Sequence, residues 1–284
     1  MLRAEVCSTL TEQVERLTAE SKARVTAVSV HDLESGLRFS LRGDRWFHAA
    51  STIKVAVLLA LFRAVDEGRV RLDDSLHVRN HFFNAADGSP FQLNRDSDAM
   101  PELYQAIGRT AKIAALAAGM ITASSNLATN LLLDFLGVAY ARNVLRDAQV
   151  QGVELRRGVE DHAAHEKGIN NEATADGLVT LLSALRGDFL RSESKEQAIR
   201  ILLEQRFNSM IPAGLPPHAA VAHKTGEIST ACHDMGIVYL PEREPYIAVI
   251  LTEFDSEREG RRETVAAISE AIYHSVMGMK GEIK

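Results

Sequence analysis

The sequence predicts an α/β (α+β) fold, with an antiparallel sheet flanked by terminal helices and an inserted all-helical region. Two observations support this prediction. Strand-like segments occur only near the two ends of the chain, and the long region between them has mostly helical periodicity. Strands from the two ends can pair in one sheet, and the helices at the two ends can pack against it.

The N-terminal part is predicted to be a helix followed by a hairpin. Residues from about 3 to 22 carry apolar side chains at helical spacing. Two strand-like runs follow, at 24–31 and 37–41. Ser35-Gly36 lies between these runs and is typical of a hairpin turn.

The region from about residue 48 to 205 is predicted to be mostly helical. Its clearest helical segments are 55–65, 112–120, 127–136 and 173–185. Residues 80–99 are polar and contain Asp87-Gly88 and Pro90. We expect this stretch to be an extended surface loop.

Strands return in the last quarter of the chain, at 219–225, 236–240 and 246–252, before a final helix at about 258–277. The last strand is apolar on both faces, which predicts a central position in the sheet. We therefore predict a sheet domain made of residues 1–47 and 207–284. Residues 48–206 form the inserted helical domain, with the candidate site at the interface.

The composition is that of a globular protein, and its negative net charge weighs against nucleic acid as a partner. The 284 residues are 46% hydrophobic and 25% charged, with a net charge of -6, and phosphate binding favours a basic face. The longest apolar run, residues 55–62, is far shorter than the roughly 20 residues of a membrane span. No glycine-rich phosphate loop is present, so neither a nucleotide nor another cofactor is expected.

The two cysteines, Cys7 and Cys232, are too few for a disulfide-stapled scaffold, and two unpaired thiols are expected. The N-terminus has no continuous apolar stretch of the kind that signal peptides contain. As written, the chain is expected to be soluble, without an export signal and monomeric. A chain from which a leader had been removed would look the same, so periplasmic, secreted and cytoplasmic locations all stay open.

The first chemical motif is Ser51-Thr52-Ile53-Lys54, a serine three residues before a lysine. On a helix, both side chains share one face, and an amine kept neutral by burial can take the serine proton. The apolar run that follows predicts that Lys54 is partly buried. Ser192 and Lys195 repeat the spacing, but their polar surroundings indicate solvated surface.

Two further motifs follow in the chain. Ser124-Ser125-Asn126 precedes a predicted helix, and Lys224-Thr225-Gly226 ends a predicted strand. Taken singly, the first is also explained as a helix cap and the second as the end of an edge strand. A lysine followed by threonine and glycine also supplies a cation, a hydroxyl group and a close approach of the backbone.

Together the three motifs resemble the S-x-x-K, S-D-N and K-T-G signatures of the class A β-lactamase family and its related serine hydrolases. The similarity extends to neighbouring segments, at 48–52, 65–68, 120–121 and 130–133, and covers nearly the whole chain. It implies a β-lactamase/transpeptidase-like fold. It also implies a serine hydrolase that opens β-lactam rings through a covalent acyl-enzyme at Ser51.

The resemblance also implies residue roles. Ser51 attacks the carbonyl carbon of the substrate, and Lys54 helps to deprotonate the Ser51 hydroxyl. Ser124 relays a proton to the leaving nitrogen. Asn126 would bind the amide of the substrate side chain, and Lys224 and Thr225 the substrate carboxylate. The backbone N–H groups of Ser51 and Glu227, on either side of the close approach at Gly226, would form the oxyanion hole.

The sequence departs from the family pattern at two motif positions. Ser125 stands where the family has an aspartate that mainly braces its loop, which is a small concern. Glu227 stands where the β-lactamases usually have a small residue. A carboxylate there should weaken binding of anionic substrates unless it points away.

The third departure concerns the acid that activates the deacylating water in class A enzymes. The family pattern R-x-E-x-x-L-N is absent, and the corresponding stretch reads Arg156-Arg157-Gly158-Val159-Glu160-Asp161. Glu160 is the preferred candidate for this base. Asp161 and the absence of any base remain alternatives.

The histidines are not expected to bind metal. His162 and His165 can share a helix face, but no carboxylate or cysteine set completes a zinc pattern. His223 alternates to the sheet face opposite Lys224 and is interpreted as structural.

Three functions therefore remain open on the same site. The leading one is β-lactam hydrolysis, and an esterase or D-Ala-D-Ala peptidase is the second. The third is a penicillin-binding or penicillin-sensing module that stays acylated. The position of the Glu160 carboxylate relative to Ser51 discriminates turnover from a persistent adduct.

Overall fold

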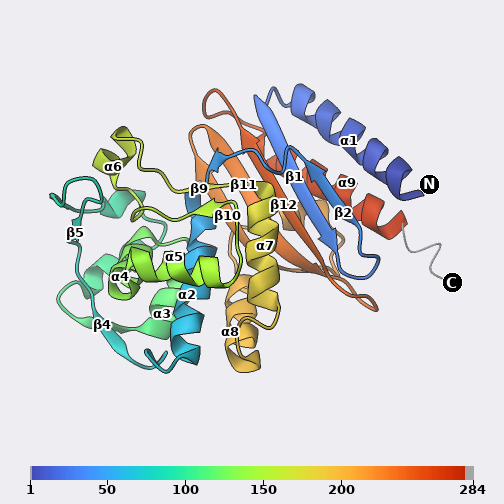
Figure 1. Ribbon diagram of the computed structural model, residues 1–284. Helices are drawn as coiled ribbons and strands as arrows, with labels where there is room; N and C mark the ends of the chain where they lie inside the picture. Colours follow the sequence, from blue (N-terminus) through green and yellow to red (C-terminus); the bar gives the residue numbers. More distant parts are fainter. Residues whose placement is uncertain (1, 279–284) are drawn as a thin grey trace.

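The computed structural model of the protein describes residues 2–278 and contains one five-stranded antiparallel sheet (Figure 1). The strand order is β10-β11-β12-β1-β2. The strands are β1 Val25–Asp32, β2 Arg38–Leu41, β10 Ala220–Ile228, β11 Ala231–Tyr239 and β12 Tyr246–Glu253. The N-terminal hairpin thus pairs with the C-terminal strands through β1 and β12, as predicted.

The two terminal helices cover one face of this sheet. They are α1 Leu2–Glu20 and α9 Arg261–Gly278, and they lie side by side on the right of Figure 1. Apolar side chains from both helices pack with every second residue of the central strands, as the period of a strand requires. Members of this core include Leu10, Val14, Val28, Val30, Ala248, Ile250, Val265 and Ile268.

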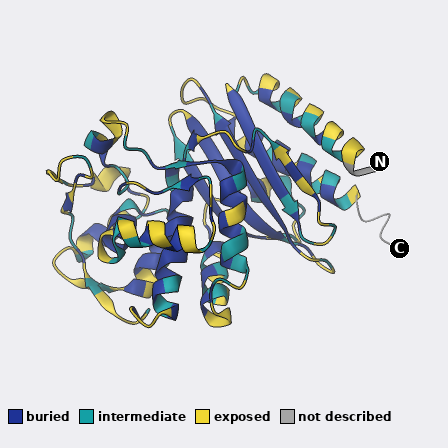
Figure 2. Cartoon of the chain, in the orientation of Figure 1, coloured by how far each residue is buried: buried dark blue, intermediate teal, exposed yellow. Residues whose placement is uncertain are grey.

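The opposite face carries the helical region. Helices α2 Lys54–Asp66, α7 Ala175–Arg186 and α8 Ser192–Leu203 contribute to a second, larger core with the other side chains of the strands. Ile247, Val249 and Leu251 of β12 belong to this core. Helix α2 is buried along nearly its whole length, as the dark blue ribbon in Figure 2 shows, because helices and sheet surround it.

Shorter elements complete the helical region. The helices are α3 Ile113–Thr122, α4 Asn126–Leu136, α5 Val138–Asp147 and α6 His162–Glu166, with 3₁₀ turns η1 Ala50–Ile53, η2 Arg95–Ser97 and η3 Pro101–Ala106. A fourth 3₁₀ turn, η4 Ile211–Gly214, packs instead against α9 on the other face of the sheet. The minor strands are β3 Phe47–His48, β4 Ser75–His77, β5 Phe82–Phe83, β6 Pro90–Phe91, β7 Thr110–Lys112, β8 Val153–Glu154 and β9 Glu172–Ala173.

The fold prediction is confirmed in its main features, including the central position of β12. The expectation that residues 80–99 form only a surface loop is wrong. This stretch contains the hairpin β5–β6, and Phe82, Leu93 and Asp98 in it are buried. Most of its polar residues are exposed, but Asn84 and Asp98 are buried and accept backbone N–H groups, of Ala86 and Asn126 respectively.

Three further expectations concern the whole chain. The division at residues 47/48 and 206/207 stays a prediction. Cys7 and Cys232 are both free thiols, the second of them buried. Within residues 2–278, every helix is too short or too polar to cross a lipid bilayer.

A buried aspartate joins α2 to α8. Asp66, the last residue of α2, accepts hydrogen bonds from the backbone N–H of Arg191, at 2.7 Å, and from the Ser194 hydroxyl. Both donors belong to the segment that resembles the nucleophile motif, where Ser192 is exposed and Lys195 pairs with Asp188. This second motif is thus the start of a structural helix.

We predict that Asp66→Ala lowers the free energy of unfolding by about 1–3 kcal/mol, because two donors lose a buried partner. Chemical denaturation measures this change. Asp73→Ala, at a carboxylate whose side chain is 59% exposed, is the control and should leave the stability unchanged. Equal effects of the two substitutions would contradict this account.

Candidate active site

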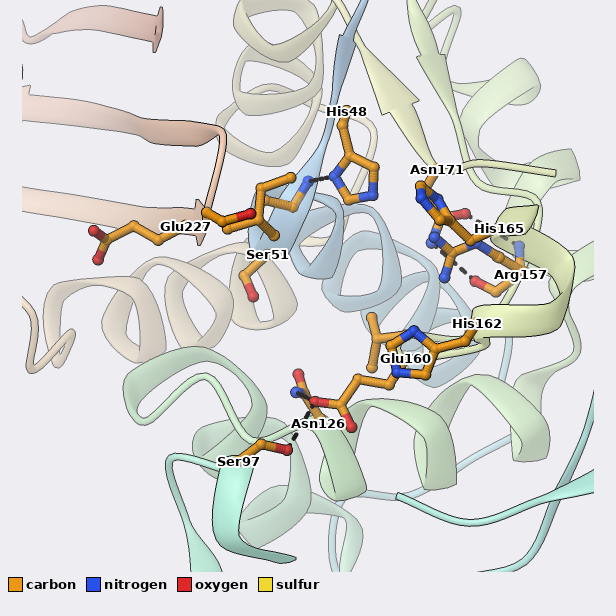
Figure 3. Close-up of a pocket in the computed structure, with 14 residues that line it drawn as sticks. His48, Ser51, Ser97, Asn126, Arg157, Glu160, His162, His165, Asn171 and Glu227 are labelled. Carbon is orange, nitrogen blue, oxygen red and sulfur yellow. Dashed lines mark hydrogen bonds between the residues drawn. The ribbon is translucent and has the colours of Figure 1, made fainter. Parts of the chain in front are cut away.

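Ser51 lies in a rigid turn between the sheet region and α2. The turn forms because Ala50 adopts a left-handed backbone conformation, with φ of 47°, and donates its N–H to His48 Nδ1 at 3.0 Å. The Thr52 hydroxyl donates to the Ala49 carbonyl at 2.6 Å. The side chain of Ser51 is half-buried, lines a cavity (Figure 3) and has no hydrogen-bond partner among residues 2–278.

Lys54 is completely buried at the start of α2. Its Nζ donates to the Ser124 carbonyl at 2.6 Å and to Asn126 Oδ1 at 2.7 Å, and it lies 3.1 Å from Ser124 Oγ. The amine is therefore directed to the second motif and not to Ser51. A neutral amine would satisfy all three contacts, with two N–H donors and a lone pair for the Ser124 hydroxyl.

Lys224 reaches the same hydroxyl from the sheet. Its Nζ donates to Ser124 Oγ at 3.0 Å and to the Thr225 carbonyl at 2.8 Å, and the side chain is fully buried. Burial lowers the pKa of Lys224 to about 7, against the raising effect of Asp234 and Glu227. The two lysines thus meet at one serine oxygen.

The same environment acts more strongly on Lys54. Burial, and then the charge of Lys224, lower the pKa of Lys54 well below its usual value, while the Asp98 and Glu160 carboxylates oppose the shift. An amine with a lowered pKa is available as a base near neutral pH.

The turn that carries Ser124 is held by a carboxylate from another segment. Ser124 has φ of 58°, a strained value for a residue with a side chain. Asp98 Oδ2 accepts the backbone N–H groups of Asn126 at 3.0 Å and Leu127 at 2.8 Å. Ser125 caps α4 at the Ala128 N–H. Sequence reasoning missed Asp98, because nothing in the sequence places residues 80–99 beneath this turn.

The edge strand β10 brings the third motif against Ser51. A side chain at Gly226 would place its Cβ 3.1 Å from the backbone nitrogen of Ser51, so only glycine allows this approach without a shift. Thr225 is buried and faces the same space as Ser51 and Ser124. The close approach brings the backbone at Glu227 to the nucleophile turn.

Glu160 and Asp161 point in different directions. The Glu160 carboxylate lines the cavity and accepts Asn126 Nδ2 at 2.7 Å and the Ser97 hydroxyl at 3.4 Å (Figure 3). Asp161 is buried and accepts the backbone N–H groups of Ala164, as the cap of α6, and Ala85. Of the two acids, only Glu160 faces the space that Ser51 lines.

The carboxylate of Glu227 points away from Ser51, as Figure 3 shows. Arg262 at the start of α9 holds it, with Nη2 at 2.9 Å and Nε at 3.0 Å. The positive charge of Arg262 therefore offsets the repulsion that the Glu227 carboxylate was expected to exert on anionic substrates.

The cavity has a volume of about 500 Å³. Its lining residues come from the nucleophile turn, η2, the start of α4, the segment before and within α6, and the end of β10. They are His48, Ala50, Ser51, Ser97, Asn126, Arg157, Val159, Glu160, His162, His165, Asn171, Glu227, Ile228 and Ser229. Lys54 and Lys224 lie behind this wall, buried.

The histidines lie in two places. His162 and His165 line the cavity, but the part of the chain that the structure describes holds no group of three or more residues suited to bind a metal. His223 is buried between Asp234 and Asn208, at 3.0 Å from each, on the face opposite Lys224. The interpretation of His223 as structural agrees with these contacts.

The comparison with protein families is decisive for the identity of the fold. A family model described as the β-lactamase enzyme family matches residues 9–276. The chain belongs to the β-lactamase enzyme family. The resemblance read from the three motifs is thereby confirmed.

Individual members of the family are distant relatives. The chain is similar to the β-lactamase ROB-1 of Haemophilus influenzae, with 26% identity over 276 residues, 95% of this chain and 85% of the relative. An ancestral class A β-lactamase is 27% identical, with a TM-score of 0.80 over 94% of this chain and 99% of that one. A PBP-A mutant in an acyl-enzyme complex with penicillin G is also 27% identical, with a TM-score of 0.80 over 95% and 97%.

We predict that Asp98→Ala lowers the free energy of unfolding by about 3 kcal/mol, because several donors lose a buried carboxylate. The matched variant Ser125→Ala removes one helix cap and should cost about 1 kcal/mol. Thermal or chemical denaturation measures both. A larger loss for Ser125→Ala would show that Asp98 does not support the turn.

Proposed function

We propose that this protein is a serine hydrolase that opens β-lactam rings through an acyl-enzyme at Ser51. The observation that carries the proposal is the meeting of Lys54 and Lys224 at the Ser124 hydroxyl, beside a serine with no bonding partner among residues 2–278. The family to which the chain belongs supports the same chemistry. The substrate is a small molecule, and we propose a monomer that binds no nucleic acid.

In the acylation step, Ser51 Oγ attacks the carbonyl carbon of the ring and its proton passes to the neutral amine of Lys54. The amine bonds Ser124 and Asn126, so this transfer needs a small rotation of the Lys54 side chain or passage of the proton through Ser124. The ring C–N bond then breaks. Ser124 gives its proton to the leaving nitrogen and regains one from Lys54, which returns to its neutral state.

The remaining site residues bind the substrate. Lys224 and Thr225 would hold the substrate carboxylate, in a smaller pocket that Ser51, Ser124 and Thr225 line. The oxyanion would accept the backbone N–H groups of Ser51 and Glu227, and one such donor is typically worth about 3 kcal/mol of barrier. Gly226 supports this role, since it lets the two backbone segments approach.

Asn126 would bind the amide oxygen of the acyl side chain with one N–H. Its Oδ1 accepts from Lys54, and one Nδ2 hydrogen already bonds Glu160. The second hydrogen of the amide group remains for the substrate. Asn126 thus bonds both Lys54, the proposed base of acylation, and Glu160, the proposed base of deacylation.

Glu160 is our candidate for the base that activates the deacylating water. It is supported by its position on the wall of the cavity that Ser51 lines, whereas both carboxylate oxygens of Asp161 bond to backbone N–H groups. An esterase or D-Ala-D-Ala peptidase would use the same nucleophile. If the bond to Asn126 keeps Glu160 from the water, the protein is a penicillin-binding module.

We predict that Ser51→Ala abolishes covalent labelling by benzylpenicillin and any hydrolysis of nitrocefin. Ser192→Ala, in the second serine–lysine motif, should leave both unchanged, because Ser192 is exposed at the start of α8. Intact-protein mass spectrometry measures the adduct. Labelling that survives in Ser51→Ala would remove the basis of the proposal.

We predict that Glu160→Gln acylates normally but accumulates the adduct, with turnover reduced by roughly 10²–10⁴-fold, since the base is lost and the shape is kept. Asp161→Asn should have a much smaller effect. Mass spectrometry over time, with nitrocefin turnover, distinguishes them. If only Asp161→Asn traps the adduct, the deacylation base is Asp161 and not Glu160. If the adduct of the wild type already persists, the protein is a penicillin-binding module.

A further inference from the structure

Arg157 is a buried cation on the wall of the cavity, across it from Ser51 and Glu227 (Figure 3). The residue is only 5% exposed. Its Nε donates to the Ile169 carbonyl at 2.7 Å and its Nη1 to the Gly158 carbonyl at 3.1 Å. Within residues 2–278, these carbonyls are the only hydrogen-bond partners of the guanidinium, and no carboxylate lies within ion-pair distance.

The charge of Arg157 therefore has no ion-pair partner among residues 2–278. The side chain of Asn171 bonds the backbone of Arg157, accepting its N–H and donating to its carbonyl. This amide is neutral and does not balance the charge of the guanidinium. Burial lowers the pKa of Arg157, and the Asp161 carboxylate opposes this shift from a distance, but its two oxygens bond to the Ala164 and Ala85 N–H groups. A buried charge without an ion-pair partner is costly, and an anion in the cavity would reduce this cost.

His48 adds a neutral donor beside Arg157. Its Nδ1 accepts the Ala50 N–H, so the ring proton is on Nε2, which has no partner among the described residues. Burial, followed by the charges of Arg157 and His165, lowers the pKa of His48 to about 4, so the ring stays neutral at pH 7. The His165 ring lies against it, with centroids 5.9 Å apart.

The other charges at the cavity lie elsewhere on its wall. Glu160 faces it from the side of Asn126 and Ser97. Glu227 is paired with Arg262 and points away. Figure 3 shows Arg157, His165 and Asn171 gathered on one side, across the cavity from Ser51 and Glu227. The cavity thus has a cationic end across from Ser51 and Glu227.

We propose that Arg157, with His48 as a second donor, binds a carboxylate at the end of the acyl chain of the substrate. This inference rests on the proposed function, because the acyl chain is defined by attack at Ser51. It goes beyond that function by naming a second anionic group on the substrate. The preferred substrates are then dianions, with one carboxylate at Lys224 and the other at Arg157.

A matched pair of penicillins tests the proposal. 6-Aminopenicillanic acid acylated with adipic acid or with hexanoic acid gives chains of equal length, of which only the first ends in a carboxylate. The measured quantity is the second-order rate constant for acylation of Ser51, which does not depend on deacylation. We expect the wild type to favour the adipoyl compound by about 10–100-fold, the value of one charge-assisted hydrogen bond.

Arg157→Gln should bring this ratio close to one, and Arg157→Lys should restore part of it. The ratio cancels any general loss of folding or catalysis, since both compounds meet the same protein. Arg156→Gln is the control, because Arg156 is exposed and pairs with Glu154 and Glu172 outside the cavity. A wild-type ratio near one, or an unchanged ratio in Arg157→Gln, would overturn the proposal.

Failure of the proposed function has a different signature. If neither penicillin labels Ser51, the proposed function is wrong. The anion site at Arg157 is then tested separately, by calorimetric measurement of the affinity of Ser51→Ala for each of the two compounds. Tighter binding of the adipoyl compound, lost on Arg157→Gln, would support the site. Equal binding, or none, would overturn it.

Discussion

The site depends on the meeting of two buried lysines at one serine oxygen. Lys54 comes from α2 and Lys224 from β10, and Ser124 Oγ lies about 3 Å from both, at 3.1 and 3.0 Å. Two ammonium groups so close and so deeply buried repel each other, and water does not screen them. Burial and Lys224 therefore favour the neutral form of Lys54, which is the form that can accept a proton from a hydroxyl.

The rest of the fold holds these groups in place. Strand β10 lies at the edge of the sheet, so Gly226 can approach the turn that carries Ser51. Asp98 reaches across from residues 80–99 and fixes the turn that carries Ser124. Arg262 neutralises Glu227 from the start of α9. Asp98 and Arg262, the charged groups that support the site, thus come from segments that do not carry its motifs.

The sequence predicts what local patterns encode, and it misses what depends on tertiary contacts. Periodicity gives the sheet, α2 and the central position of β12, and motif spacing gives Ser51, Ser124 and Lys224. Asp98 is absent from any motif, because it acts on a turn 28 residues away. The neutralisation of Glu227 and the burial of Arg157 also arise between distant segments. For the same reason, the sequence does not show that the carboxylates of Glu160 and Asp161 point in different directions, whereas the structure does.

The central claim is that burial and the charge of Lys224 hold the pKa of Lys54 well below its usual value, and NMR titration of lysine side chains tests it most directly. The chain has eight lysines, so signals from protein labelled with ¹³C at the lysine ε-carbon can be resolved and assigned by Lys54→Ala and Lys224→Ala. The account predicts a pKa for Lys54 far below its usual value and a pKa of about 7 for Lys224. Titration of both signals near 10.5, the ordinary lysine value, would contradict it.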